Sequence, residues 1–148
     1  MHVVLYQPEI PYNTGSVGRT CVAVGAKLWL VRPLGFQLDD RRMRRAGLDY
    51  WQHLRWEVVD DWDALAERLG KQRQWLFSKT AATGYTEVKY EPDDVLIFGS
   101  ESQGLPRSIL QANAGRCLRI PIRPEARSLN LSVSVAVIAF EARRQCMP

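Results

Sequence analysis

The sequence predicts a single α/β domain spanning residues 1–148, with a parallel sheet and helices on both of its faces. Short apolar runs alternate with helix-like segments along the chain, as strands and crossover helices do in parallel sheets. The runs are continuously apolar, which is typical of strands buried on both faces. A length of 148 residues with 46% hydrophobic and 24% charged residues suits one globular domain.

Six apolar runs bounded by turn-forming residues are expected to be strands. In chain order they are Val3–Tyr6, Leu28–Val31, Trp56–Val59, Trp75–Phe77, Val95–Phe98 and Cys117–Ile120. The segments between most of these runs, and the segment after the last, are expected to be helices. They are Asn13–Val24, Asp39–Ala46, Asp61–Leu69, Pro106–Ala112 and Leu131–Gln145. The longest loop-like stretch, Gly84–Asp94, has room for a short edge strand.

Composition argues against several classes of protein. The longest apolar run, Val135–Phe140, is too short to cross a bilayer, and Met1–Tyr6 lacks the basic start of a signal peptide. We therefore expect a cytoplasmic protein with no membrane partner. The three cysteines are widely separated and there are only two histidines, so we expect neither a disulfide framework nor a metal site.

The distribution of charge suggests a nucleic-acid partner. The formal net charge is +4, and the isoelectric point is about 9.2. Two groups of arginines stand out, namely Arg41, Arg42, Arg44 and Arg45, and later Arg116, Arg119, Arg123 and Arg127. Acidic residues gather elsewhere, at 57–63 and 91–94. A positive surface on one side of the molecule is the expected result.

The start of the first expected helix has an unusual composition. Asn13 is a suitable N-cap, and Gly15 and Gly18 each cost the helix about 1 kcal/mol in propensity. Gly15 and Arg19 are four residues apart and share a helix face. A bare patch beside a cation would suit a phosphate or a partner subunit. An ordinary helix start with a surface arginine would explain the same residues.

The strand Val95–Phe98 runs into a polar loop that holds one carboxylate. Gly99 ends the strand, Glu101 follows it, and Gly104 lets the loop turn back. Neither the dinucleotide-binding glycine pattern nor the Walker A pattern is present. Glu101 would accept hydrogen bonds from a ligand, or it would cap the helix that starts near Pro106.

The segment Ser128–Val135 alternates polar and apolar residues, which ordinarily indicates an edge strand. The run continues to Gln145 with helical character, and its small residues also suit a tightly packed helix. In that case Asn130 is the natural N-cap. Periodicity leaves both alternatives open.

Three segments together resemble the three motifs of the SPOUT (SpoU-type) RNA 2′-O-methyltransferases. They are N-x-G-x-x-x-R at 13–19, F-G-x-E-x-x-G-L at 98–105, and I-P…S-L-N-L-S at 120–132. Further matches at 5–11, 44–50 and 140–145 resemble the small TrmL/YibK branch, which methylates the wobble nucleotide (position 34, C or modified U) of leucine tRNAs. The alternatives are a related enzyme acting on another tRNA or rRNA position, and a non-catalytic RNA-binding knot protein.

The resemblance implies a C-terminal trefoil knot, a homodimer, tRNA as the partner, and S-adenosylmethionine as the cofactor without a metal. By position, the implied cofactor contacts are Lys79, Gly99, Glu101, Ile120, Ser128 and Leu129. The implied catalytic residues are Arg19 and Asn130, with Arg19 of one subunit approaching the cofactor of the other. The RNA-binding residues are expected to be Asn13, Arg41, Arg42, Arg44, Arg45 and Arg127.

The motifs contain no histidine, so the commonest general base is missing. A guanidinium keeps its proton at neutral pH. We therefore expect Arg19 to orient the ribose hydroxyl and neutralise the adjacent phosphate, with the proton passing to that phosphate or to water. Glu101 is expected to order the cofactor loop, and Ser128 and Asn130 to hold the third motif. Position 140 is Phe, where some relatives have Tyr, and Lys79 is expected to act through its main chain.

Overall fold

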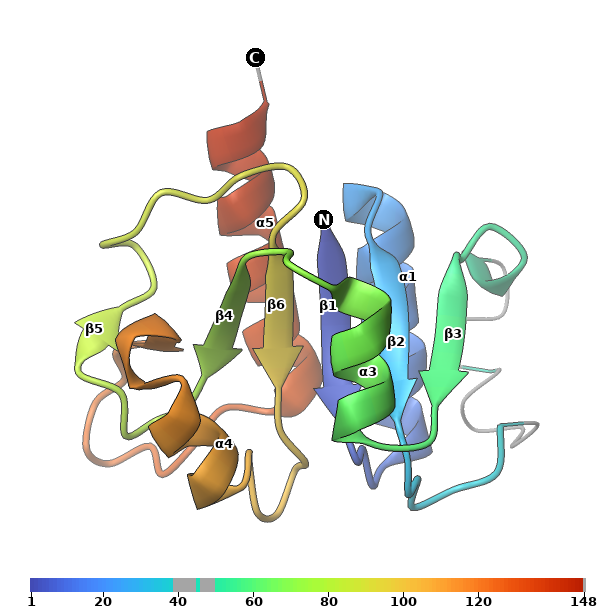
Figure 1. The fold of residues 1–148 in the computed structure, drawn as a ribbon, viewed down its shortest axis with the longest axis horizontal. Coiled ribbons are helices and arrows are strands. Elements are labelled where there is room, and N and C mark those ends of the chain that lie inside the picture. The colour runs from blue at the N-terminus through green and yellow to red at the C-terminus, as the bar shows by residue number, and fades with distance from the viewer. Residues whose placement is uncertain (39–44, 46–49, 148) are drawn as a thin grey trace.

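The computed structural model describes residues 1–38, 45 and 50–147. Within these residues, seven parallel strands form one sheet in the order β3-β2-β1-β6-β4-β7-β5 (Figure 1). The strands are β1 (His2–Tyr6), β2 (Lys27–Val31), β3 (Trp56–Val59), β4 (Gln74–Phe77), β5 (Thr83–Gly84), β6 (Val95–Phe98) and β7 (Cys117–Arg119). The predicted parallel sheet is confirmed, and each of the six expected strands is present.

The strand β5 lies at one end of the sheet, where it pairs with β7. It overlaps the loop-like stretch Gly84–Asp94 at a single residue. The edge strand suggested for that stretch is therefore only two residues long and sits at its very start. Beyond it, the side chain of Glu87 turns back and accepts a hydrogen bond from the main-chain N–H of Gly84 at 2.6 Å.

Helices cover both faces of the sheet, as expected (Figure 1). They are α1 (Pro11–Val24), α3 (Trp62–Leu69), α4 (Arg107–Ala112) and α5 (Leu131–Cys146), with a short 3-10 helix, η1 (Ala114–Arg116). In Figure 1, α3 and α4 lie in front of the sheet, and α1 and α5 lie behind it. The predicted helix Asp39–Ala46 falls outside the described residues apart from Arg45. The described part of the chain contains no helix long and apolar enough to span a membrane.

The alternation of side chains along the central strands explains why these runs are apolar throughout. In β1, Val3 and Leu5 belong to the core beneath α1 and α5, whereas Val4 belongs to the core beneath α3 and α4. All three are fully buried. Burying each such side chain contributes about 1.5–3 kcal/mol, so both faces of the sheet select apolar residues.

The segment after Asn130 is a helix, so the strand alternative for Ser128–Val135 is wrong. Val135, Ile138, Ala139 and Ala142 recur at helical spacing and are completely buried. The alanines allow α5 to pack closely beside α1. Tertiary packing therefore settles what the period-two pattern left open.

Candidate active site

The predicted cofactor residues lie at the carboxyl edge of the sheet, where the parallel strands end. The neighbouring strands β6, β4 and β7 lead directly into the loops that hold Gly99, Lys79 and Ile120. Phe77 pairs in register with Phe98 and with Leu118. The structure therefore brings three segments far apart in sequence to one edge. Ligands of open parallel sheets bind at this kind of edge.

The loop after β6 folds back on its own first residue. A Cβ atom on Gly99 would lie 2.0 Å from the carbonyl carbon of Gly104. The N–H of Gly104 donates to the carbonyl oxygen of Ser100 at 2.9 Å, and Gly104 has φ of +68°. Gly99 is thus required by the loop's own backbone, and Gly104 by its left-handed conformation.

Glu101 caps the N-terminus of α1. Its carboxylate accepts hydrogen bonds from the main-chain N–H groups of Glu9 (2.7 Å) and Ile10 (3.1 Å), and from Nδ2 of Asn13 (3.2 Å). A negative charge at this position also interacts favourably with the helix dipole. The alternative that Glu101 caps the helix near Pro106 is wrong, because its carboxylate is bound at the start of α1 and α4 starts without a side-chain cap.

Asn13 does not cap its own helix, although the sequence predicted that it would. Helix α1 begins two residues earlier, at Pro11, with Ile10 at the N-cap and no side-chain cap from that residue. Proline at the first helical position and the carboxylate of Glu101 explain the earlier start. Asn13 is instead only 4% exposed, and its amide links Glu101 to Asn130.

Asn130 caps α5, as predicted. Its Oδ1 accepts hydrogen bonds from the N–H of Ser132 (2.8 Å) and the N–H of Val133 (3.4 Å), and from the Ser132 hydroxyl (2.6 Å). Its Nδ2 donates to Oδ1 of Asn13 at 3.0 Å. Residues from all three motifs are therefore joined in one hydrogen-bonded chain, Glu101–Asn13–Asn130. Both polar atoms of the Asn130 side chain are engaged by protein groups.

Arg19 is exposed on α1, eight residues after its start. At 1.5 Å per residue it lies about 12 Å along the helix from the carboxyl edge. Its guanidinium carbon sits 4.5 Å from the centroid of the Tyr50 ring. Within one chain, Arg19 is therefore not brought together with the three loops.

The glycines beside Arg19 do not form a bare surface. Gly15 and Gly18 are buried, and a Cβ atom on Gly18 would lie 2.7 Å from the Trp51 ring. The prediction that these glycines leave space for a phosphate or a partner subunit is therefore wrong. Gly18 instead admits an aromatic side chain of the same chain. Trp51 comes from the segment after residue 49, and no local pattern marks it as the partner of Gly18.

The remaining predicted residues fall into two groups. Lys79, Arg127, Ser128 and Leu129 are exposed, and Ile120 is half-buried, in the loops after β4 and β7. Arg45 is exposed as well, whereas Arg41, Arg42 and Arg44 lie outside the described residues. The loops therefore offer main-chain groups beside the apolar side chains of Ile120 and Leu129. These features suit S-adenosylmethionine, whose adenine needs apolar contact and which carries no phosphate.

Sequence reasoning missed a second link, between the residues that lead into α1 and the second motif. The Glu9 carboxylate accepts hydrogen bonds from the Ser102 hydroxyl (2.5 Å) and the Ser102 N–H (3.1 Å). Gln7, in the same loop, has φ of +51°, which is uncommon for a residue other than glycine. Glu9 is 93 residues from Ser102, and no local signal connects them.

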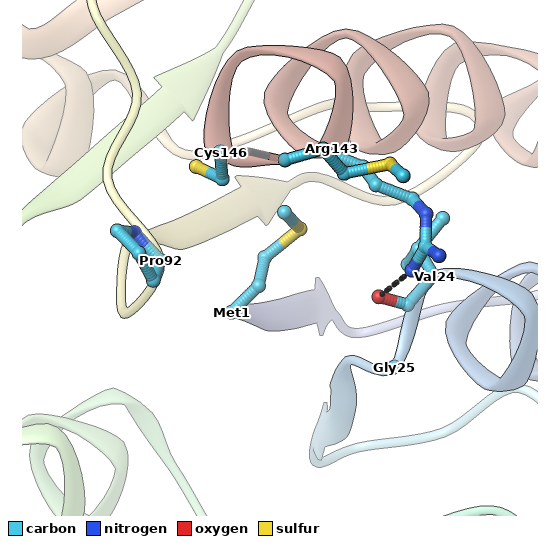
Figure 2. Close-up of a pocket in the computed structure, with 7 residues that line it drawn as sticks. Met1, Val24, Gly25, Pro92, Arg143 and Cys146 are labelled. Carbon is cyan, nitrogen blue, oxygen red and sulfur yellow. Dashed lines mark hydrogen bonds between the residues drawn. The ribbon is translucent and has the colours of Figure 1, made fainter.

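A surface hollow of about 250 Å³ lies at the opposite edge of the sheet (Figure 2). Its lining includes Met1, Gly25 and Pro92, which precede β1, β2 and β6, and Arg143 donates a hydrogen bond to the carbonyl oxygen of Val24 at 3.0 Å. No residue of the three motifs lines it. Across the described residues, no three His, Cys, Asp or Glu side chains are grouped as a metal site would require.

Comparison with known proteins identifies the family. The model of the SpoU rRNA methylase family matches residues 1–140. A Burkholderia ambifaria tRNA (cytidine(34)-2′-O)-methyltransferase is 47% identical over 148 residues, 97% of this chain and 94% of its own. The enzyme of the same name from Saccharophagus degradans is 44% identical over the same shares of the two chains.

Two solved structures agree in fold. One, described as giving insights into the 2′-OH methylation of C/U34 on tRNA, superposes with a TM-score of 0.93 at 46% identity and covers 97% of this chain and 94% of its own. An AdoMet-bound rRNA methyltransferase from Sinorhizobium meliloti superposes at 0.86 with 27% identity, over 99% of this chain and 57% of its own. The expected C-terminal trefoil knot follows from this fold. The chain therefore belongs to the SpoU methylase family of S-adenosylmethionine-dependent methyltransferases.

Proposed function

We propose that this methyltransferase modifies the ribose 2′-hydroxyl of nucleotide 34, C or modified U, in leucine tRNAs. The observation that carries the proposal is the hydrogen-bonded chain Glu101–Asn13–Asn130, which joins the three motifs at the carboxyl edge of the sheet. Relatives 44% and 47% identical over nearly the whole chain bear the name of a position-34 enzyme. The choice of leucine tRNAs rests on the resemblance to the TrmL/YibK branch.

The loops after β4, β6 and β7 would hold the cofactor. Main-chain groups at Lys79, Gly99 and Ile120 and the residues Ser128 and Leu129 would form the contacts. When bound, S-adenosylmethionine supplies an activated methyl group, so the protein has to align the acceptor and assist loss of its proton. Glu101 contributes by ordering the loop, since its carboxylate is already engaged by α1.

Arg19 would orient the acceptor hydroxyl and neutralise the neighbouring phosphate. A guanidinium is a poor base, and its fork of donors suits phosphate. His2 starts β1, at the edge opposite the three loops, and so offers no base there. The proton would pass to the RNA phosphate or to water. Asn130 would act as a positioning residue, because its amide already binds Asn13 and the start of α5.

A homodimer would bring Arg19 of one subunit to the cofactor loops of the other. Large apolar side chains are exposed at the start of α1, along α5 and just before the N-cap of α5. They are Ile10, Tyr12, Leu129, Val133 and Phe140. Tyr12 is 62% exposed and Phe140 is 51% exposed. Exposed apolar residues gathered on two packed helices favour a self-complementary contact. A tRNA substrate also fits a cytoplasmic location.

The decisive assay incubates the protein with labelled S-adenosylmethionine and total cellular RNA, and then maps the 2′-O-methyl nucleotides. We expect label at nucleotide 34 of leucine tRNAs. Label at another tRNA position or in rRNA would identify a different SPOUT activity, and no label in any RNA would favour a non-catalytic RNA-binding protein. Arg19→Ala should abolish transfer while both ligands still bind, and Arg68→Ala, which removes an exposed arginine of α3, should not. Wild-type transfer by Arg19→Ala would disprove the role given to Arg19.

A further inference from the structure

The segment Arg107–Arg127 carries the whole formal charge of the protein. It contains five arginines (Arg107, Arg116, Arg119, Arg123 and Arg127) and one glutamate, Glu125, which gives it a charge of +4. The full chain is also +4, so the positive and negative charges of all other residues cancel. The five arginines are all exposed. The excess positive charge therefore lies on one continuous stretch from α4 to the start of α5.

These arginines are also weakly paired within the protein. Several basic residues elsewhere form close ion pairs, including Lys27–Glu57, Arg68–Glu57, Arg73–Asp94 and Arg144–Glu141, at 2.7–2.8 Å. In the segment, the described ion pair is Arg123–Glu125 at 3.7 Å, with the two side chains 90% and 75% exposed. Such an exposed pair contributes little, so the guanidinium groups remain available to a partner.

Four of the five arginines lie at the same edge of the sheet as the cofactor loops. Arg119 ends β7, Arg123 and Arg127 follow it, and Arg107 begins α4 directly after the loop of Gly99. Side chains two residues apart on a strand point to the same face. Cys117, two residues before Arg119, faces α4, because its Sγ lies 3.6 Å from the carbonyl oxygen of Leu110. Arg119 is therefore directed to the α4 side.

We propose that Arg107, Arg119 and Arg123 form a docking surface for the sugar–phosphate backbone of the RNA stem next to the target nucleotide. S-adenosylmethionine has no phosphate, so the cofactor does not account for this charge. The guanidinium fork binds phosphate oxygens in a bidentate manner and without regard to sequence. The proposal rests on the proposed function, and it adds RNA-binding residues beyond those predicted at Arg41–Arg45.

Arg116 provides a matched control. It is an exposed arginine of the same segment, but it lies in η1, just before β7, and so at the opposite end of that strand from Arg119. Its replacement removes one positive charge from the same segment, as does each of the two replacements in the tested variant. A contact between RNA and the carboxyl edge should therefore distinguish Arg119 from Arg116, whereas a general attraction to net charge should not.

The test measures binding of full-length protein to an anticodon stem-loop RNA at salt concentrations from about 50 to 200 mM. For Arg107→Gln/Arg119→Gln, we expect weaker binding and a salt slope, log K against log[salt], that falls by about 1 for each lost phosphate contact. The dissociation constant for S-adenosylmethionine should not change. For Arg116→Gln, the slope should equal that of the wild type.

An unchanged slope in the double variant would overturn the proposal. So would an equal decrease in Arg116→Gln, or a decrease confined to Arg45→Gln. Methyl transfer by the wild type is measured separately. If the wild type methylates nucleotide 34 and the double variant keeps the wild-type slope, the docking surface is wrong and the proposed function stands. If the wild type transfers no methyl group but the slope falls as expected, the surface is supported and the proposed function fails.

Discussion

The carboxylate of Glu101 should contribute more to stability than its place in a surface loop would suggest. Glu101→Ala removes the cap of α1, a loss of about 0.5–2 kcal/mol. It also leaves Nδ2 of the nearly buried Asn13 without an acceptor, which costs about 1–3 kcal/mol. Together these losses amount to about 1.5–5 kcal/mol, which at about 3 °C per kcal/mol for a chain of this length lowers Tm by about 5–15 °C.

Thermal unfolding followed by circular dichroism measures this loss. Glu125→Ala is the control, because Glu125 is 75% exposed and its ion-pair partner is 3.7 Å away. That variant should stay within about 0.5 kcal/mol of the wild type. Glu101→Gln keeps one acceptor oxygen and should fall between the two. If Glu101→Ala were no less stable than Glu125→Ala, the capping role derived from the contacts would be refuted.

A double-mutant cycle isolates the link to Asn13. If the two side chains stabilise each other, Glu101→Ala and Asn13→Ala should be non-additive, with a coupling of at least about 0.5 kcal/mol. Additive losses would show that the 3.2 Å contact between Glu101 and Asn13 carries no energy of its own.

Three further predictions concern other parts of the molecule. Burial lowers the pKa of His2 below its ordinary 6.5, so the folded state favours the neutral ring; this stabilisation is present above about pH 6.5 and is lost as pH falls below that value. The Tm of the wild type should therefore fall between pH 7 and pH 5 by more than that of His2→Gln, and parallel profiles would exclude His2. Gly99→Ala should abolish methyl transfer and lower Tm, because its Cβ would meet Gly104 at 2.0 Å, whereas Gly115→Ala, with no atom within 4 Å, should do neither. Phe140→Glu should convert the expected dimer to a monomer in light scattering while the far-ultraviolet circular dichroism spectrum is kept; a wild type that is already monomeric would contradict the dimer.

The sequence predicts the helices and strands of this fold better than it predicts which of them lie side by side. Continuous apolar runs such as Val95–Phe98 indicated strands buried on both faces, and both faces are indeed covered. The order of the strands was not predictable, because β6 lies between β1 and β4 through contacts that no local pattern encodes. The alternating run at Ser128–Val135 left two structures open, and burial against α1 and the sheet decided for the helix.

In the candidate site, too, contacts between residues close in sequence were predicted and contacts between distant residues were not. Asn130 was identified as a cap because its partners, Ser132 and Val133, are close in sequence. For Glu101 the sequence left a ligand or the helix near Pro106 as the partner, because the helix that it caps lies about 90 residues away. Gly18 marked a close approach correctly, but its neighbour is Trp51. The residue types thus indicated that these positions contact specific partners, and the fold determined which residues the partners are.

The chain Glu101–Asn13–Asn130 also has a direction. An ionised carboxylate can only accept hydrogen bonds, so it obliges the Asn13 amide to point its NH₂ group toward Glu101 and its oxygen toward Asn130. Asn130 must then turn its own NH₂ group to Asn13, which leaves its oxygen for the N–H groups that open α5. One charge in the loop after β6 thereby fixes the orientation of two amides and sets the polarity of the contacts at the starts of both α1 and α5.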